Sequence, residues 1–232
     1  MYKGLIIKTY GSYHFGSLWD LTDQYMGQLI RLFNTPTNAV DLPLGGRNSV
    51  TIAQLEGIGS VVIKHYTRGG IIRHIVKRSY VKWGKTRSQL EYEALQKVGG
   101  LGVNVPEPIA YAYQGTLFYR AWLVTREIVQ QKTLAELSRI DEGQARIAMK
   151  EVLIQVATLI RNNIHHADLH PGNVLVESAG RVFILDFDKC SLSRGNRNKL
   201  RDKYLRRWRR AVTKHRLPGM LSEMMSAGLR SD

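Results

Sequence analysis

The sequence contains almost no cysteine, since Cys190 is its single thiol. One thiol cannot form an intramolecular disulfide, which excludes a scaffold held together by disulfides and favours a compartment facing the cytosol. The sequence also lacks a run of about 18 apolar residues, so no transmembrane helix is expected. The short apolar stretch at the N-terminus is interrupted by Lys8 and precedes no small-residue cleavage site, so no signal peptide is expected.

Acidic residues are scarce in comparison with basic ones. The chain has 34 Lys and Arg against 19 Asp and Glu, which gives a formal net charge of +15 over 232 residues. Such a surface favours polyanionic partners, namely nucleic acid, anionic lipid or a phosphorylated sugar, although charge alone also serves solubility. The 44% of hydrophobic residues is ordinary for a globular protein, so the chain is expected to fold around a substantial core.

The pattern of apolar residues predicts an α+β chain. Strand-like runs at residues 50–53 and 61–66 flank a glycine-containing turn and predict a hairpin. Residues 86–98 are expected to form a helix that stops at two glycines, and residues 121–128 predict a strand that ends in a connector. Residues 18–33 also show helical spacing, but the first 40 residues indicate no function.

Helical patterns dominate after residue 133. The clearest is a long helix over residues 143–163, and its expected buried face consists of Ile147, Val152, Val156, Leu159 and Ile160. Because the composition shifts near residue 128, we predict one domain over residues 1–232 with two lobes. The N-terminal lobe (1–128) would be mainly antiparallel β-structure with one helix, and the C-terminal lobe (129–232) mainly helical. A connector between two lobes predicts a cleft suited to a cofactor.

The strongest functional signal lies in residues 166–176, His-Ala-Asp-Leu-His-Pro-Gly-Asn-Val-Leu-Val, followed by Asp186. Short apolar strands at 174–176 and 182–185 flank a turn, and a hairpin there would bring Asn173 and Asp186 to the same end of the strand pair. Phosphoryl transfer from ATP needs a carboxylate to orient and deprotonate the incoming hydroxyl, and it needs Mg²⁺, which prefers oxygen ligands. We therefore predict that Asp168 is the base and that Asn173 and Asp186 hold the metal.

This pattern resembles the catalytic loop and metal-binding aspartate of the protein-kinase-like superfamily, and it implies a bilobal fold of that kind. The Asp-x4-Asn spacing matches, whereas His-Ala-Asp stands for His-Arg-Asp and Asp-Phe-Asp for Asp-Phe-Gly. These departures argue against regulation by activation-loop phosphorylation and leave the metal chemistry intact. A polar surface turn beside a hairpin is the alternative interpretation, and His166 itself is expected to brace the loop.

The first half of the chain supplies candidates for binding ATP. Lys64 ends an apolar strand, as the phosphate-binding lysine does in this superfamily, and its expected partner is Glu91, with Glu93 as the alternative. Glycines before that strand let backbone N–H groups approach phosphates. The predicted phosphate loop contains Gly45, Gly46 and Ser49. The connector Arg126, Glu127 and Ile128 would offer backbone groups to the adenine.

Several segments in order resemble the lipopolysaccharide kinase family, most closely the 3-deoxy-D-manno-octulosonic acid (Kdo) kinases. They are Gly-Gly-Arg-Asn-Ser at 45–49, Lys-His-Tyr-Thr-Arg-Gly-Gly at 64–70, Val-Pro-Glu-Pro at 105–108, Leu-Val-Thr-Arg-Glu-Ile at 123–128, and the loop with Asp-Phe-Asp. Asn48 replaces an expected glycine. The resemblance implies transfer of the ATP γ-phosphate to a hydroxyl of Kdo on lipid A, at the cytoplasmic face of the inner membrane.

A basic stretch follows Asp186 closely, with no Ala-Pro-Glu motif, which disfavours a protein substrate. Residues 194–216 hold eleven Lys and Arg and one acid, Asp202. Apolar residues fall on one helical stripe of that stretch, which suits either an anionic membrane surface or a helix packed on the core. The stripe consists of Leu200, Tyr204, Leu205, Trp208, Ala211 and Val212. A second basic cluster is predicted to meet lipid A phosphates or to be surface charge; it consists of Lys77, Arg78, Lys82, Lys85 and Arg87.

Other functions fit parts of the pattern. The same fold could serve a heptose-directed lipopolysaccharide kinase, an aminoglycoside phosphotransferase-like enzyme or an atypical protein kinase. A non-catalytic basic module that binds membranes or nucleic acid is the alternative from another class. The intact set of Lys64, Asp168, Asn173 and Asp186 argues against that module, and no zinc-finger spacing or RNA-binding aromatic motif favours nucleic acid. The sequence does not indicate the oligomeric state.

Overall fold

The computed structural model describes residues 4–35, 50–66, 80–81, 84–116 and 118–230. These residues form two compact units, one made of residues 1–93 and 107–127 and the other of residues 94–106 and 128–232. The change from one unit to the other at residues 127 and 128 lies beside the lobe boundary expected from the sequence. Residues 94–106 group with the second unit, which no sequence pattern indicated.

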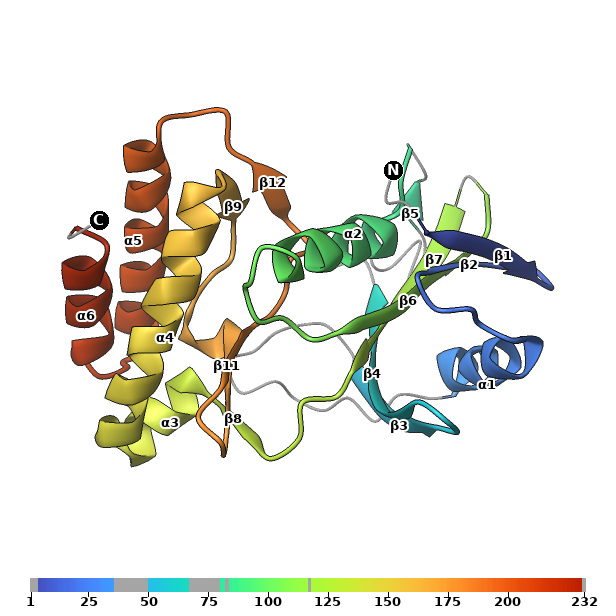
Figure 1. Cartoon of the computed structure of the whole chain (residues 1–232), viewed down its shortest axis with the longest axis horizontal. Helices are drawn as coiled ribbons and strands as arrows, with labels where there is room; N and C mark the ends of the chain where they lie inside the picture. The colour runs from blue at the N-terminus through green and yellow to red at the C-terminus, as the bar shows by residue number, and fades with distance from the viewer. Residues whose placement is uncertain (1–3, 36–49, 67–79, 82–83, 117, 231–232) are drawn as a thin grey trace. The chain divides into compact units, whose positions relative to one another are not determined.

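The first unit is built on an antiparallel sheet whose strand order is β1-β2-β6-β7-β4-β3, with β5 paired to β7 (Figure 1). The strands are β1 (Ile6–Tyr10), β2 (Tyr13–Ser17), β3 (Val50–Leu55), β4 (Gly59–Tyr66), β5 (Tyr80–Val81), β6 (Pro108–Gln114) and β7 (Phe118–Arg126). The expected hairpin is present as β3 and β4, in which Val50 pairs with Lys64. The register therefore fixes the position of Lys64 near the end of β4.

Helices α1 (Asp23–Asn34) and α2 (Arg87–Gly99) accompany this sheet. The side chain of Thr22 caps α1 by accepting from the Tyr25 N–H, so the helix begins later than the amphipathic pattern did. In α1, Phe33 stacks on Trp122 of β7 at 4.6 Å between ring centroids. In α2, Tyr92 meets Tyr111 of β6 edge-on at 5.4 Å. The first unit thus contains α1 as well as the start of α2, where one helix was expected.

The second unit combines helices with two small sheets. The helices are α3 (Leu134–Ile140), α4 (Glu142–Arg161), α5 (Arg197–Lys214) and α6 (Met220–Gly228), with the short 3₁₀ helix η2 (Pro171–Asn173). The strand order of one sheet is β11-β10-β8, and β12 pairs with β9 in the other. These strands are β8 (Gln131–Thr133), β9 (Ile164–His166), β10 (Val174–Glu177), β11 (Val182–Ile184) and β12 (Cys190–Leu192).

Helix α4 forms the centre of the second unit. Its buried side includes Val152, Val156, Leu159 and Ile160 as expected, but the prediction for Ile147 was wrong, because this side chain is 58% exposed. Ile147 lies two residues before buried Met149, about 200° around the helix, which turns it to solvent. The buried Gln155 donates to the carbonyl of Val182 and accepts from the Asn104 N–H, which ties residues 94–106 to this unit.

The α+β class expected from the sequence is confirmed, and the architecture is compatible with a bilobal protein-kinase-like fold. In the part of the chain that the structure describes, no helix is long and apolar enough to cross a membrane.

Candidate active site

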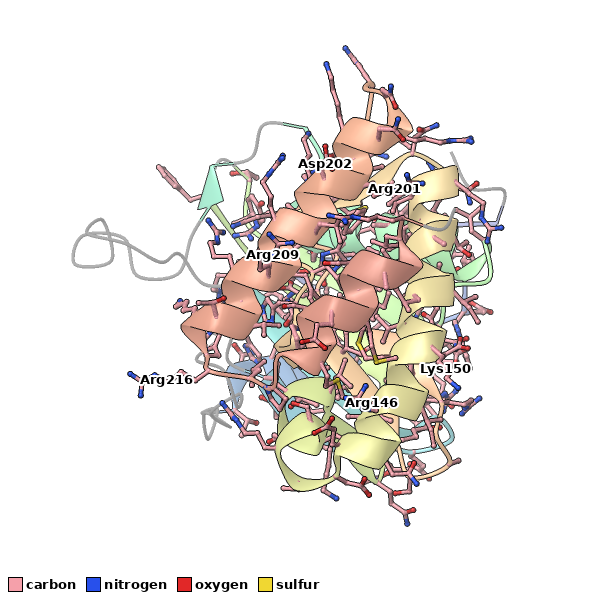
Figure 2. All side chains as sticks on the ribbon, turned by 90° about the vertical axis from the view of Figure 1, so that its left-hand side faces the viewer. Arg146, Lys150, Arg201, Asp202, Arg209 and Arg216 are labelled. Carbon is pink, nitrogen blue, oxygen red and sulfur yellow. The ribbon has the colours of Figure 1, made fainter. Side chains whose placement is uncertain are left out.

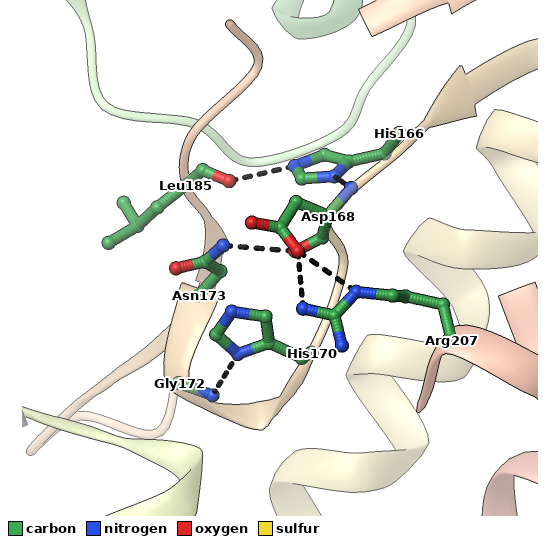
Figure 3. A network of polar contacts seen from close by, with 7 residues as sticks. All are labelled: His166, Asp168, His170, Gly172, Asn173, Leu185 and Arg207. Atoms are coloured by element: carbon green, nitrogen blue, oxygen red, sulfur yellow. Dashed lines mark hydrogen bonds and ion pairs between the residues drawn. The ribbon is translucent and has the colours of Figure 1, made fainter. Parts of the chain in front are cut away.

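The loop between β9 and β10 carries Asp168 and is held by its own polar groups (Figure 3). The side-chain amide of Asn173 donates to the backbone carbonyl of Asp168 at 3.0 Å, and the Asn173 N–H donates to the carbonyl of His170 at 2.8 Å. His170 Nδ1 in turn accepts from the Gly172 N–H at 3.1 Å. Pro171 favours the tight η2 turn, because its fixed φ suits the first position of a helix. The loop therefore keeps Asp168 and Asn173 in a fixed relation.

His166 braces this loop, as the sequence suggested. Its ring is buried, and its Nδ1 accepts from the Asp168 N–H at 3.3 Å, so the ring proton lies on Nε2, which donates to the carbonyl of Leu185 at 2.8 Å. The ring also meets Phe187 edge-on at 4.6 Å. Because both nitrogens serve backbone groups, His166 links the Asp168 loop to the segment that carries Asp186.

The carboxylate of Asp168 forms an ion pair with Arg207 of α5. Arg207 Nε donates to Asp168 Oδ1 at 2.9 Å, and Nη2 donates to the same oxygen. Partial burial alone would raise the pKa of the Asp168 carboxyl, but the hydrogen bond and charge of Arg207, helped by His170 and His166, hold this pKa below its usual range. Asp168 is therefore ionised at neutral pH, as an acceptor of a hydroxyl proton must be.

Neighbouring His170 is neutral at the same pH. Burial lowers its pKa to about 4, and the charge of Arg207 acts in the same direction, whereas Asp168 opposes both. A neutral ring is consistent with its Nδ1 accepting a hydrogen bond from Gly172. Among the three neighbouring side chains Asp168, His170 and Arg207, only Arg207 thus carries a positive charge at neutral pH.

The β10–β11 hairpin brings Asn173 and Asp186 to one end of the strand pair. Val174 pairs with Ile184, and the Leu185 N–H donates to the carbonyl of Asn173 at 2.9 Å, one residue before Asp186. Asp186 has a φ of +64°, a left-handed conformation that reverses the chain as it leaves β11. This local geometry agrees with the hairpin predicted from the sequence.

The donors at this hairpin end suit a hard divalent cation. The amide nitrogen of Asn173 is turned toward Asp168, so its oxygen lies on the other side, and Asp186 supplies a carboxylate (Figure 3). No three His, Cys, Asp or Glu side chains gather into a metal cluster among the residues that the structure describes. The residues thus provide an amide and a carboxylate, the combination that leaves room for the phosphate oxygens of a nucleotide.

The first unit contains the ion pair expected for Lys64. Its Nζ lies 3.0 and 2.8 Å from the two carboxylate oxygens of Glu91, and the hydroxyl of Tyr66 donates to the same carboxylate. The side chains of Lys64 and Glu91 are 13% and 3% exposed. Glu93, the alternative partner, instead pairs with Lys85 at 2.6 Å. The structure therefore brings Lys64 to Glu91, and the role of this pair toward ATP stays a prediction.

A model of one protein family, described as the lipopolysaccharide kinase (Kdo/WaaP) family, matches residues 33–225. This range includes all the candidate site residues and most of the chain. The chain belongs to the lipopolysaccharide kinase (Kdo/WaaP) family. The resemblance expected from the sequence is thereby confirmed.

Curated relatives agree with the family. The chain is 34% identical over 148 residues to a Vibrio vulnificus (strain CMCP6) protein named 3-deoxy-D-manno-octulosonic acid kinase, and the match covers 62% of each protein. Proteins of the same name from Vibrio parahaemolyticus and Xylella fastidiosa (strain 9a5c) are 31% and 29% identical over 160 and 175 residues. These two matches cover 66% and 74% of this chain, and 65% and 69% of the relatives. The chain thus spans about two thirds of the length of the relatives it matches.

The connector predicted to contact adenine is already hydrogen-bonded in this family member. The Arg126 N–H donates to the carbonyl of Glu107 at 2.8 Å, and the Glu127 N–H donates to the carbonyl of Ser60 at 3.0 Å. The Arg126 side chain is bound to Glu107, whereas Ile128 is buried and belongs to the second unit. An adenine contact at this segment would therefore use backbone groups other than these two N–H groups, and it stays a prediction.

Part of the predicted site lies outside the described residues. This applies to the phosphate-loop residues Gly45, Gly46 and Ser49, and to Lys77, Arg78 and Lys82 of the second basic cluster. Of the rest of that cluster, Lys85 pairs with Glu93, and the guanidinium of Arg87 lies 5.6 Å from the centre of the Tyr66 ring. The predictions for these groups as ligands of phosphate remain predictions.

Sequence reasoning missed Arg207 as part of the site of this lipopolysaccharide kinase family member. It was one of eleven basic residues in a run, and nothing in its spacing from Asp168 indicated a contact. A partial signal existed, because Arg207 lies between buried Tyr204 and Trp208 and so borders the apolar stripe of α5. A cation beside an apolar stripe has fewer directions open to it than one on the outer face.

Proposed function

We propose that this family member is an ATP- and magnesium-dependent kinase that phosphorylates a hydroxyl of Kdo on lipid A. The observation that carries this proposal is the fixed loop in which ionised Asp168, tied to Asn173, adjoins the hairpin end that bears Asp186. An oriented carboxylate next to oxygen donors for a cation is the arrangement that phosphoryl transfer to an alcohol needs.

Each residue has a proposed task. Asp168 orients the acceptor hydroxyl and takes its proton, while Asn173 and Asp186 hold the cation. Magnesium, when bound, neutralises charge on the phosphate oxygens. Lys64, kept in place by Glu91, contacts the ATP phosphates. Gly45, Gly46 and Ser49 are proposed to contact the phosphates through their backbone.

The acceptor is proposed from two observations. Curated relatives at 29–34% identity are named Kdo kinases. In addition, little chain is available to bind a protein substrate after Asp186, because β12 begins at Cys190 and pairs with β9, and α5 begins at Arg197. A sugar hydroxyl needs no such segment, which favours the glycolipid over a peptide.

We further propose that the protein works at the cytoplasmic face of the inner membrane, where its basic surface meets anionic lipid. The apolar stripe of α5 is buried within the second unit except for half-buried Leu205, so this helix packs on the core and leaves mainly its charged side for a membrane. Figure 2 shows Arg201 and Arg209 along α5, Arg216 just after the end of this helix, and Arg146 and Lys150 on α4. We call these five residues the basic face. Attraction to anionic headgroups would therefore be mainly electrostatic.

The direct test incubates purified protein with labelled ATP, Mg²⁺ and a Kdo-bearing lipid A precursor, with Asp168→Ala as the control. We expect label in the glycolipid only with the unmutated protein, and a loss of roughly 10³-fold or more in the variant, because the base is removed. Transfer only to heptose-bearing acceptors would mean that the acceptor sugar is heptose and not Kdo. Near-normal turnover by Asp168→Ala would show that the base is another residue.

A further inference from the structure

We propose that Arg207 is a positioning residue of the reaction: it holds one oxygen of Asp168 so that the other oxygen faces the acceptor hydroxyl. This inference rests on the proposed function, since it assigns a task to a group that acts on the base. Arg207 itself need not touch ATP or the sugar.

The hydrogen-bond geometry carries the inference. Both Nε and Nη2 of Arg207 donate to Oδ1 of Asp168. A guanidinium paired with a carboxylate in the common two-by-two manner would occupy both oxygens. Here Oδ2 accepts no hydrogen bond from any residue that the structure describes, and Figure 3 shows it on the side away from the guanidinium. The pair therefore fixes the rotation of the carboxylate and leaves one oxygen for a hydroxyl.

The position of Arg207 is itself anchored to the strand that leads into the loop. One turn before it in α5, the hydroxyl of Tyr204 accepts from the His166 N–H at 2.9 Å and donates to the carbonyl of Ile164 at 2.8 Å. The next residue, Trp208, is buried and donates from Nε1 to the carbonyl of Leu221 at 3.0 Å. Helix α5 is thus bound to β9 on one side and to α6 on the other.

Burial distinguishes Arg207 from its basic neighbours. Its side chain is 22% exposed, whereas Arg206, Arg209 and Arg210 are exposed to solvent. An arginine that only served solubility or membrane attraction would sit on the exposed side of α5. The guanidinium of Arg207 is half-buried and has therefore lost part of its hydration. Its hydrogen bonds to the carboxylate of Asp168 compensate for this desolvation cost.

The test measures kcat and KM for ATP and for the acceptor in four proteins: unmutated, Arg207→Gln, Arg207→Lys and the matched control Arg206→Gln. We expect Arg207→Gln to lower kcat about 100-fold, as expected for a reacting group that is free to rotate, with both KM values changed less than about threefold. Arg207→Lys should recover part of kcat, because it restores one donor and the charge. Arg206→Gln should behave as the unmutated protein.

A double-mutant cycle decides whether Arg207 acts through Asp168. In an Asp168→Asn background, adding Arg207→Gln should cause no further loss, because there is no longer a carboxylate to position. An additional 100-fold loss would overturn the inference, as would a kcat of Arg207→Gln equal to or above that of the control. If Arg207→Gln fails to fold, the Lys variant takes its place in the cycle.

Failure of the proposed function is distinguishable from failure of this inference. The cycle is run with whichever acceptor the unmutated protein phosphorylates, Kdo-bearing or heptose-bearing. If the protein phosphorylates another acceptor but not Kdo, only the acceptor assignment is wrong. The role of Arg207 is then measured with that other acceptor. A protein that phosphorylates no acceptor overturns both.

Discussion

At the scale of single residues, the Lys64–Glu91 pair combines stability with the proposed chemistry. Glu91 is 2% exposed and receives hydrogen bonds from both Lys64 and Tyr66. A buried carboxylate that loses its cation keeps the cost of its desolvation without compensation. A variant at Lys64 can therefore lose activity for two separate reasons, lost phosphate contact and lost stability.

We predict that the two effects separate in a pair of variants. Lys64→Met should lower the free energy of unfolding by about 3 kcal/mol, because it leaves Glu91 buried without a partner charge. Lys64→Met combined with Glu91→Leu should recover most of this loss, yet neither protein should transfer phosphate. Urea unfolding followed by circular dichroism gives the stability, and the labelled-ATP assay gives the activity. Activity restored in the double variant would argue against the role of Lys64 toward ATP.

Cys190 offers a second prediction at this scale. Burial raises the pKa of its thiol to about 11, although the charge of Lys97 acts in the opposite direction. Below that pH the thiol stays protonated, and only the thiolate reacts. At pH 8 we expect alkylation by iodoacetamide to be about 100-fold slower in the folded protein than in urea, and to accelerate as pH rises toward 11. Mass spectrometry of timed samples measures it, and equal rates in both states would contradict the burial.

The site residues that the sequence could predict are those whose contacts are local or follow from strand register. Asn173 and Asp186 lie at the same end of a strand pair because a short hairpin joins them, and Lys64 is fixed by its hairpin with β3. Glu91 was the expected partner of Lys64 with Glu93 as the alternative, and the structure pairs Lys64 with Glu91. Arg207 lies 39 residues after Asp168, and its contact depends on how α5 packs. A contact that depends on tertiary packing in this way produces no recognisable spacing pattern in the sequence.

At the scale of elements, α3 shows how a local signal stabilises a part of the site. Thr133 caps the helix by accepting from the Glu136 N–H, and the Glu136 side chain accepts from the Thr133 N–H, which makes a capping box. Thr133 also pairs with Leu175 of β10 across the three-stranded sheet. The cap thus joins α3 to the hairpin that carries Asn173.

We predict that Thr133→Ala lowers the free energy of unfolding by about 1 kcal/mol, because the first turn of α3 loses an acceptor for a backbone N–H. The matched control is Thr213→Ala in α5, an exposed position with no cap to lose. Alanine there improves helix propensity, so stability should stay equal or rise slightly. Thermal unfolding of both variants measures the difference. Similar losses in the two proteins would mean that the cap contributes nothing beyond an ordinary threonine.

Elements were predictable where capping and periodicity agreed, and less so where one pattern allowed two faces. The β3–β4 hairpin, α2 and α4 occur close to their expected residues. Ile147 of α4 was assigned to the buried face, although it is exposed. In the sequence, an apolar residue next to the buried stripe of a helix cannot be distinguished from a residue within that stripe. The apolar stripe of α5 fitted core and membrane equally well until its side chains were seen to be buried.

At the scale of the whole molecule, the net charge of +15 raises the question of whether the proposed attraction to membranes comes from the overall charge or from one local surface. If the overall excess of basic residues caused the attraction, the loss of any positive charge on the surface would weaken membrane binding equally. The basic face concentrates arginines on α5 and directly after it, and Asp202 is the one acid in this helix. Each basic side chain close to an anionic surface adds about 1 kcal/mol of attraction. Because the apolar stripe of α5 is buried, a local site should respond strongly to charge and to salt.

We therefore predict that vesicles containing phosphatidylglycerol bind the protein, and that Arg209→Gln with Arg216→Gln weakens binding about 30-fold, the equivalent of about 2 kcal/mol. The control, Lys132→Gln with Arg181→Gln, removes the same charge from exposed positions on the three-stranded sheet and its turn. Co-sedimentation at low and high salt compares the three proteins. Equal weakening in both double variants would make the attraction a property of net charge. Binding that persists in about 0.5 M salt would contradict an electrostatic contact, because screening then acts within a few ångströms.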